Sequence, residues 1–239
     1  MSQKMMLKTI TQQASVLSLN LRNVDELFPG FAPGDFAVIY GSPSIEYLSS
    51  LVCVRAQLPV EVGGLNTNVL FIDNGNTFNR HQVTRLLQRC HLDLKQALSR
   101  IHITRACTAY QLTSLIMEHL KNNVNEFNAK VIIISDIISL FLANNISDDE
   151  ACRVFNQITM CLQKFARENQ IIILATCPKH PNNIRNANLF TITNSNSNVI
   201  IALRQSLYDS EFELEKHPYL LLGSAEFPSS NPTLMDFTY

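Results

Sequence analysis

Four short runs of apolar, largely β-branched residues constrain the fold of this chain more than any other feature. They cover residues 36–40, 69–73, 130–136 and 171–176, and a weaker fifth run covers residues 101–105. Continuous apolar character, without alternation of apolar and polar residues, is typical of strands that are covered on both faces. These runs therefore predict a buried and mainly parallel β-sheet.

Helical patterns separate the predicted strands. Asn79 and Thr108 each precede an amphipathic stretch and are expected to cap a helix. A third helix is expected over residues 147–169, with three acidic residues in its first turn, where they favour the positive end of the helix dipole. Strands alternating with helices of this length predict an α/β fold, with a mainly parallel β-sheet flanked by helices.

The composition of the sequence changes towards its end. Residues 177–198 are polar and rich in asparagine, which predicts a long loop. Two β-like stretches follow at 199–205 and 219–222, and we expect them to form a short antiparallel edge on the sheet. A length of 239 residues with 46% hydrophobic residues suits one large domain. We expect residues 1–17 to form an N-terminal arm or short element and residues 18–239 to form that domain.

Charge and composition exclude several classes of function. Nineteen basic residues against 20 acidic residues leave no overall attraction to nucleic acid or to anionic lipid. The sequence has no apolar run long enough for a membrane helix and no signal peptide, so we expect a cytoplasmic protein without a membrane partner. Its six cysteines and six histidines are scattered, which predicts buried reduced thiols and no metal site.

The turn after the first predicted strand lies where many α/β proteins hold a phosphate. It consists of Gly41-Ser42-Pro43-Ser44-Ile45-Glu46-Tyr47-Leu48. Only its first residue fits the phosphate-binding pattern G-x-x-x-x-G-K-[ST]. Glu46 replaces the second glycine, Tyr47 the lysine and Leu48 the hydroxyl that binds magnesium, so we expect neither a nucleotide nor another cofactor at this turn.

Several segments occur in the order and spacing of a known family. They are Val24-Asp25-Glu26-Leu27, Gly34, Gln57-Leu58-Pro59, Gly63-Gly64-Leu65, Phe71-Ile72-Asp73, Thr77-Phe78 and Ile101-His102-Ile103-Thr104-Arg105-Ala106. On these segments the chain resembles the ATPase core of the archaeal RadA family, which belongs to the RecA-like recombinases. The resemblance covers most of residues 18–176 and implies a RecA-like core. Members of the family assemble on single-stranded DNA and use ATP at subunit interfaces.

The resemblance also implies that the family's chemistry has been lost. The acidic general base of the family corresponds to Gly75, and the aspartate that ends the Walker B strand corresponds to Ser135, with Asp136 one position away. The polar pair that couples nucleotide to DNA corresponds to Cys177-Pro178. We therefore expect no catalytic residue and a degenerate, pseudo-ATPase site.

Direct DNA contact is a second question that the resemblance raises. The first DNA loop of the family corresponds to residues 143–151, which carry three acids and should repel phosphate. The second lies within residues 177–198, where Lys179, His180 and Arg185 form a weak candidate patch and Phe190 could stack on a base. Another basic group, which includes Arg85, Arg89 and Arg105, is expected to be a solvated face.

The function expected from this combination is that of a degenerate recombinase paralog. Such a protein would act as a non-catalytic accessory or regulator in homologous recombination and DNA repair, through contacts with an active RadA-type recombinase or another paralog, in a homo- or hetero-oligomer. One alternative is a single-stranded DNA-binding module that uses the basic patch. Another is a protein with residual ATP binding through Asp73 or Asp136.

Overall fold

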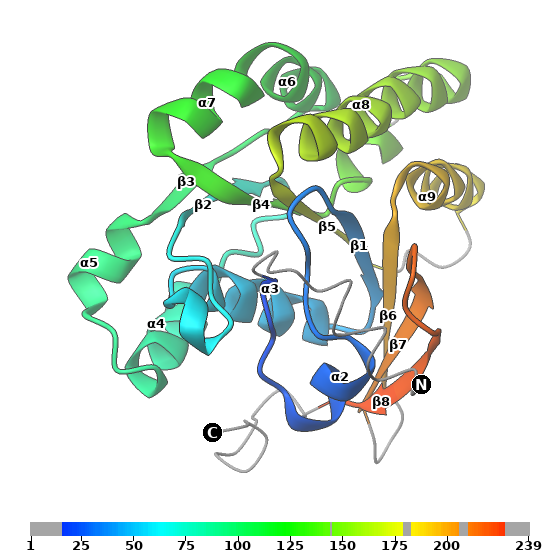
Figure 1. Ribbon diagram of the computed structural model, residues 1–239. Coiled ribbons are helices and arrows are strands. Elements are labelled where there is room, and N and C mark those ends of the chain that lie inside the picture. Colours follow the sequence, from blue (N-terminus) through cyan, green and yellow to red (C-terminus); the bar gives the residue numbers. More distant parts are fainter. Residues whose placement is uncertain (1–15, 144, 179–182, 206–209, 228–239) are drawn as a thin grey trace.

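The computed structural model describes residues 16–143, 145–178, 183–205 and 210–227. The strands within these residues are β1 (Phe36–Gly41), β2 (Asn68–Asp73), β3 (Ile101–Thr104), β4 (Ala129–Ser135), β5 (Ile172–Pro178), β6 (Val199–Gln205), β7 (Ser210–Lys216) and β8 (Gly223–Glu226). They form a mixed sheet in the order β3-β2-β4-β5-β1-β6-β7-β8 (Figure 1). The first six strands of this order run parallel, and β7 and β8 join antiparallel at one edge. The predicted fold class is confirmed.

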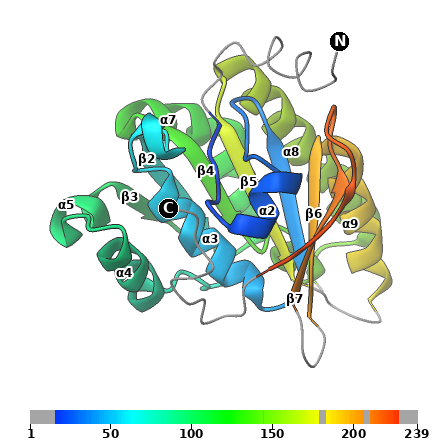
Figure 2. The same cartoon turned by 60° about the horizontal axis from the view of Figure 1, so that its bottom comes forward.

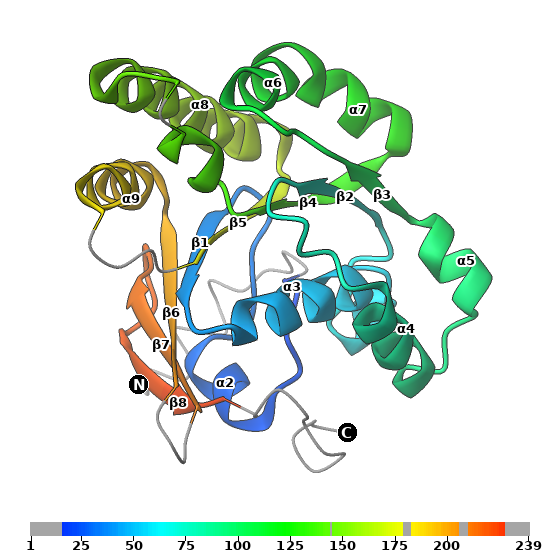
Figure 3. The same ribbon diagram turned by 180° about the vertical axis from the view of Figure 1, so that it is seen from behind.

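Helices cover both faces of the sheet, as Figures 1 and 3 show from opposite sides. One face carries α2 (Arg22–Leu27), α3 (Ser44–Arg55), α4 (Arg80–Arg89) and α5 (Leu94–Ser99). The other carries α6 (Ala109–Ser114), α7 (Leu120–Phe127), α8 (Asp148–Asn169) and α9 (Ile184–Asn196). Three short turns of helix are η1 (Val60–Val62), η2 (Leu115–His119, a π-helix) and η3 (Ser139–Leu142). In Figure 2, α3 lies in front of the sheet, with β3 at one end and β7 near the other.

The central strands are buried on both faces, as their apolar sequence predicts. From Val131 to Ser135 every residue of β4 is buried, and β5 is buried from Ile172 to Cys177. Two separate apolar cores result, one under each helical layer. Burial of this kind supplies the main favourable free energy of folding.

The predicted helix starts are confirmed at atomic detail. Asn79 accepts a hydrogen bond from the Gln82 amide at 3.0 Å, and Thr108 accepts one from the Gln111 amide at 3.2 Å. Ser147 caps α8 in the same way, and the acidic residues 148–150 occupy the first turn. Each cap satisfies one of the amide groups that a helix leaves without a partner at its start.

Two predictions for the C-terminal part are wrong. The asparagine-rich segment expected to be a loop contains the helix α9, because Asn183 caps its start and Leu189 and Thr193 give it a buried side. Residues 219–222 form no strand. The strand β7 pairs antiparallel with β6, and β8 pairs antiparallel with β7. The β7 sequence alternates buried residues with glutamates, a period of two that indicates a half-buried strand.

No helix of the described residues is long and apolar enough to cross a membrane. The cysteines carry free thiols, but burial varies more than predicted: Cys53 and Cys177 are buried, whereas Cys107 is exposed. Burial raises the pKa of the Cys53 and Cys177 thiols far above its ordinary value, so these two thiols stay protonated at neutral pH.

Candidate functional site

The turn between β1 and α3 is short and closed. The strand β1 ends at Gly41 and α3 begins at Ser44, so two residues make the connection. Gly41 adopts φ +120°, and a Cβ at this position would lie 2.1 Å from the Leu203 carbonyl oxygen. Glycine is therefore required for the close approach of β1 to β6 at this point.

The backbone amides of this turn are all engaged within the protein. Pro43 has no amide hydrogen. The Ser42 amide donates to the Leu203 carbonyl at 2.8 Å, and the Ser44 amide donates to the Ser42 hydroxyl at 3.3 Å. The Ile45 amide donates to the Ser42 carbonyl at 3.1 Å, and the Glu46 amide donates to the Pro43 carbonyl at 3.2 Å. A phosphate-binding loop works through amides that point at the ligand. Residues 42–46 offer none.

The two positions that matter most in the phosphate-binding pattern face the core. The side chain of Tyr47 is buried, with the residue 3% exposed, and its ring packs edge-on against Phe227 with centroids 6.3 Å apart. Leu48 is 0% exposed within the same core. Glu46, by contrast, is exposed at the start of α3. The helix thus turns the lysine and hydroxyl positions away from solvent and leaves a carboxylate outside.

A cavity of about 320 Å³ lies beside this turn. Its described lining residues are Gly41, Ser42, Pro43, Ile45, Glu46, Ser49, Thr77, Thr176 and Pro178. This lining has one carboxylate, four hydroxyl groups and, among the described residues, no lysine, arginine or histidine. The described residues of this lining therefore offer a polyphosphate no positively charged side chain, and residues 42–46 offer it no free amide.

Asp73 and Ser135 join the ends of β2 and β4. The Ser135 hydroxyl donates to Asp73 Oδ1 at 3.0 Å and accepts from the amides of Asn74 and Gly75 at 3.1 and 3.3 Å. Asp73 also accepts from the Thr77 amide at 2.8 Å and pairs with Arg105 at 3.5 Å. Both side chains are therefore engaged in holding the segment 73–77 in place.

Asp136 is turned towards the chain that follows it. Its backbone is left-handed, with φ +43°, and its carboxylate accepts from the Ser139 amide at 3.2 Å. The Asp136 amide donates to the Thr176 hydroxyl at 2.9 Å. A side chain at Gly75 would place its Cβ 3.1 Å from the Asp136 Cβ and 3.0 Å from Thr77 Cγ2. A side chain at position 75 would therefore require its neighbours to shift by a few tenths of an ångström.

The basic patch predicted for DNA looks different in the structure. Lys179 and His180 lie outside the described residues. Arg185 pairs with Asp148 at the start of α8 and donates to the carbonyls of Ala143 at 2.9 Å and Phe141 at 3.3 Å. Its side chain is 17% exposed. Arg185 thus ties α9 to η3 and to α8 instead of presenting its guanidinium to solvent.

Phe190 and Arg105 both make contacts within the protein. Phe190, a candidate for stacking on a base, packs edge-on against Tyr40 with ring centroids 4.7 Å apart. Arg105 is 59% exposed, as expected of a residue on a solvated face, and it also pairs with the buried Asp73. Local sequence patterns do not predict the pairing of Arg105 with Asp73, because the two residues are 32 positions apart in sequence. The available signal was that Asp73 ends one parallel strand and Arg105 follows another, and the carboxyl ends of parallel strands lie at the same edge of the sheet.

Replacing Arg185 by alanine is expected to lower the free energy of unfolding by about 1–2 kcal/mol, because two carbonyls and Asp148 lose a charged donor. Thermal denaturation followed by circular dichroism measures this. The matched control is Arg153→Ala, since Arg153 is exposed on the same helix α8 that Arg185 contacts, and its loss should change stability by less than about 0.5 kcal/mol. Equal stability of both variants would show that the tie is unimportant.

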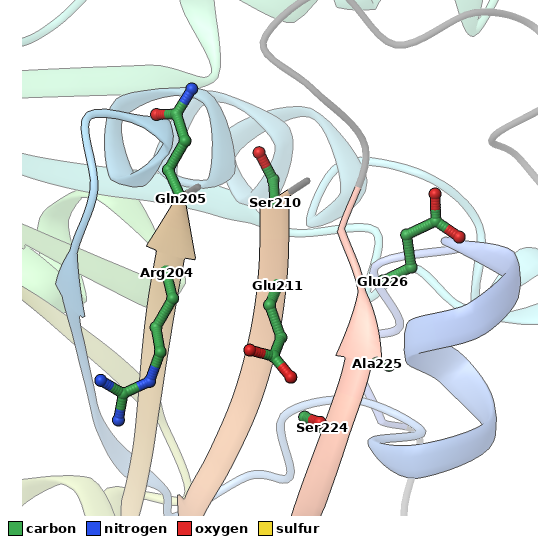
Figure 4. Close-up of a pocket in the computed structure, with 7 residues that line it drawn as sticks. All are labelled: Arg204, Gln205, Ser210, Glu211, Ser224, Ala225 and Glu226. Atoms are coloured by element: carbon green, nitrogen blue, oxygen red, sulfur yellow. The ribbon is translucent and has the colours of Figure 1, made fainter. Parts of the chain in front are cut away.

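A second hollow, of about 660 Å³, lies over the antiparallel edge (Figure 4). Glu211 on β7 stands opposite Glu226 on β8, and Asn23 donates to Glu226 at 3.3 Å. Arg204 on β6 pairs with Glu213 and Glu215 of β7. The strands therefore carry more acid than base here, which also disfavours an anionic ligand.

A comparison with protein families places these observations in context. The family model described as Rad51 matches residues 16–199. The match includes the β1–α3 turn, the Asp73–Ser135 contact and α9, and it covers well over half of the chain.

Proposed function

Because this chain belongs to the Rad51 family of RecA-like recombinases, we propose that it serves recombination and repair as a non-catalytic accessory protein. Family membership supports the recombinase-like character of the protein. The non-catalytic role is our proposal, and one observation carries it. The amides and side chains of the β1–α3 turn that could hold a triphosphate are either bonded internally or buried.

The charges around the cavity support the same proposal. Glu46 is an exposed lining residue of this cavity. A carboxylate about 4 Å from a phosphate charge is repelled by about 4 kcal/mol at an effective dielectric constant near 20. The missing lysine removes a further favourable contribution of about 1.5–3 kcal/mol per charged hydrogen bond. These contributions outweigh the attraction of one helix N-terminus, which is typically about 0.3–1 kcal/mol.

Hydrolysis would also need a group that activates water, and position 75 has no side chain. General bases contribute through a carboxylate or imidazole within hydrogen-bonding reach of the nucleophile. Asp73 is bonded to Ser135, Thr77 and Arg105, and the Asp136 carboxylate accepts a hydrogen bond from the Ser139 amide. These engagements favour a pseudo-ATPase over the alternative of residual nucleotide use.

The sheet topology supports a contact surface for a partner at one edge of the sheet. The strand β3 ends the sheet, and within the described residues no strand pairs with its outer side. Ile103 in this strand is 46% exposed. The opposite edge differs, because α2 packs beside β8 (Figure 4). An unpaired strand edge can accept a further strand from another protein, so we propose β3 as the face that contacts a recombinase subunit.

Two measurements test the accessory role. Calorimetric titration with ATP and magnesium should give no saturable binding up to millimolar nucleotide, whereas a saturable isotherm would contradict the non-catalytic proposal.

Pull-down should capture a purified active recombinase of the same family, and Ile103→Glu should weaken that capture at least about tenfold, because it places a charge at the contact. The control is Ile184→Glu, at an isoleucine that is 82% exposed on α9. Absence of capture at every salt concentration would overturn the partner proposal.

A further inference from the structure

In the loop of residues 217–222, which joins β7 to β8, Leu220 packs against the core and one imidazole accepts two backbone hydrogen bonds. His217 Nδ1 accepts hydrogen bonds from the backbone amides of Leu220 at 3.0 Å and Tyr219 at 3.3 Å. A ring nitrogen accepts only when it carries no proton. These two contacts therefore specify a neutral His217 with its hydrogen on Nε2.

The surroundings of His217 favour the neutral ring. Its ring packs edge-on against Phe28, with centroids 6.0 Å apart, and against Tyr219 at 4.6 Å. Burial among these groups lowers the pKa of the imidazole below its ordinary value. The neutral form is thus matched both by the hydrogen bonds and by the apolar neighbours.

Charged groups on the neighbouring elements are engaged elsewhere or lie outside the core. Lys216, the preceding residue, donates to the carbonyls of Asn194 and Ser197 at the end of α9. Asp35, before β1, accepts from the Ala32 amide and from Asn198. On α2, Asp25 accepts hydrogen bonds from Ser18 and Leu21, and Glu26 is exposed. On β7, Glu215 accepts hydrogen bonds from Tyr40 and Arg204.

The loop presents apolar side chains to solvent. Tyr219, Leu221 and Leu222 are 73%, 89% and 57% exposed. Three large apolar side chains within four residues form an unusual surface for a soluble domain. Their arrangement depends on the backbone of residues 219 and 220, which is the part of the loop that His217 holds.

We propose that His217 is a proton-operated latch on this loop: the neutral ring fixes residues 219 and 220, and protonation of Nδ1 releases them. The added proton, taken from solvent, turns Nδ1 from an acceptor into a donor that faces two further donors. Both amides then lose their partner, and the apolar side chains lose their fixed arrangement. The device is independent of nucleotide and of the partner surface proposed at β3.

The direction of the pH dependence follows from the lowered pKa. The contribution of the latch is fully present above about pH 6.5, the ordinary pKa of histidine. It is lost as pH falls from that value through the lower pKa of the folded protein. An increase in pH above 7 should leave the loop unchanged.

Nuclear magnetic resonance on the full chain tests the latch. As pH is lowered from 7.5 to 5, the backbone amide shifts of Tyr219 and Leu220 should follow the same titration curve as the His217 ring protons. Hydrogen exchange at these two amides, corrected for intrinsic rates, should lose about tenfold protection one pH unit below that midpoint. Amide shifts that stay constant while His217 titrates would overturn the proposal.

Variants give a second, independent outcome. His217→Asn places an amide oxygen where Nδ1 lies and cannot be protonated in this range, so protection should persist at pH 5. The matched control is His119→Asn, at an exposed histidine in η2. In this variant the amides of Tyr219 and Leu220 should respond to pH as they do in the wild type. A pH response of Tyr219 and Leu220 that is unchanged in His217→Asn would contradict the latch.

Discussion

Rebuilding the phosphate-binding pattern with Tyr47→Lys and Leu48→Ser is expected to give a chain that does not fold. Both side chains lie in the core, since Tyr47 is 3% exposed and Leu48 is 0% exposed. Truncating a buried leucine or aromatic residue costs about 2–5 kcal/mol each, and an unpaired buried ammonium adds to this. The sum of about 5–10 kcal/mol is comparable with the whole stability of a typical domain.

Far-ultraviolet circular dichroism and thermal denaturation measure the outcome. The matched control is Glu46→Gly, which restores the second glycine of the same pattern at an exposed position. Glycine near a helix start should cost no more than about 1 kcal/mol. A cooperative transition of the double variant close to that of the wild type would show that α3 can rotate to expose these positions, and would remove the main support for a closed site.

The second large effect is expected from Gly41→Ala. The added Cβ would meet the Leu203 carbonyl oxygen at 2.1 Å, and the backbone at φ +120° is one that alanine rarely adopts. Because the obstacle is backbone and not the end of a flexible side chain, β1 and β6 must separate where they pair. We expect a loss of about 3 kcal/mol or more and a fall in Tm of about 6–12 °C.

The control for this prediction is Gly223→Ala in β8. There the added Cβ would meet only Leu27 Cδ1, at 3.3 Å, and that side chain can move. We expect a change of less than about 1 kcal/mol. Urea denaturation of both variants makes the comparison, and similar midpoints would show that the β1–β6 contact tolerates a side chain at position 41.

The elements that could be predicted from sequence are those in which a local pattern and its burial agree. The apolar runs of β1, β2, β4 and β5 are covered on both faces, so their composition alone predicts them. The caps at Asn79 and Thr108 are equally local. In contrast, α9 has a narrow buried side formed by Leu189 and Thr193, and its asparagines suggest a loop until Asn183 is seen to cap it.

The candidate site could be predicted only in part. Departure from the phosphate-binding pattern is visible in the sequence at Glu46, Tyr47 and Leu48. Whether those side chains face the core depends on the rotation of α3, which no local pattern fixes because nearly every residue of that helix is buried. The contact between Asp73 and Ser135 joins residues 62 positions apart and arises only when β2 and β4 pair.

The crowding around Gly75 bears on how such a protein can change over generations. A Cβ added at position 75 would lie 3.0 Å from Thr77 Cγ2 and 3.1 Å from the Asp136 Cβ, so these neighbours would have to shift by a few tenths of an ångström. Those segments are themselves held by Ser135, Ser139 and Thr176. An acidic substitution at position 75 is therefore coupled to the residues at positions 77 and 136, and its effect on stability depends on how far these neighbours can move.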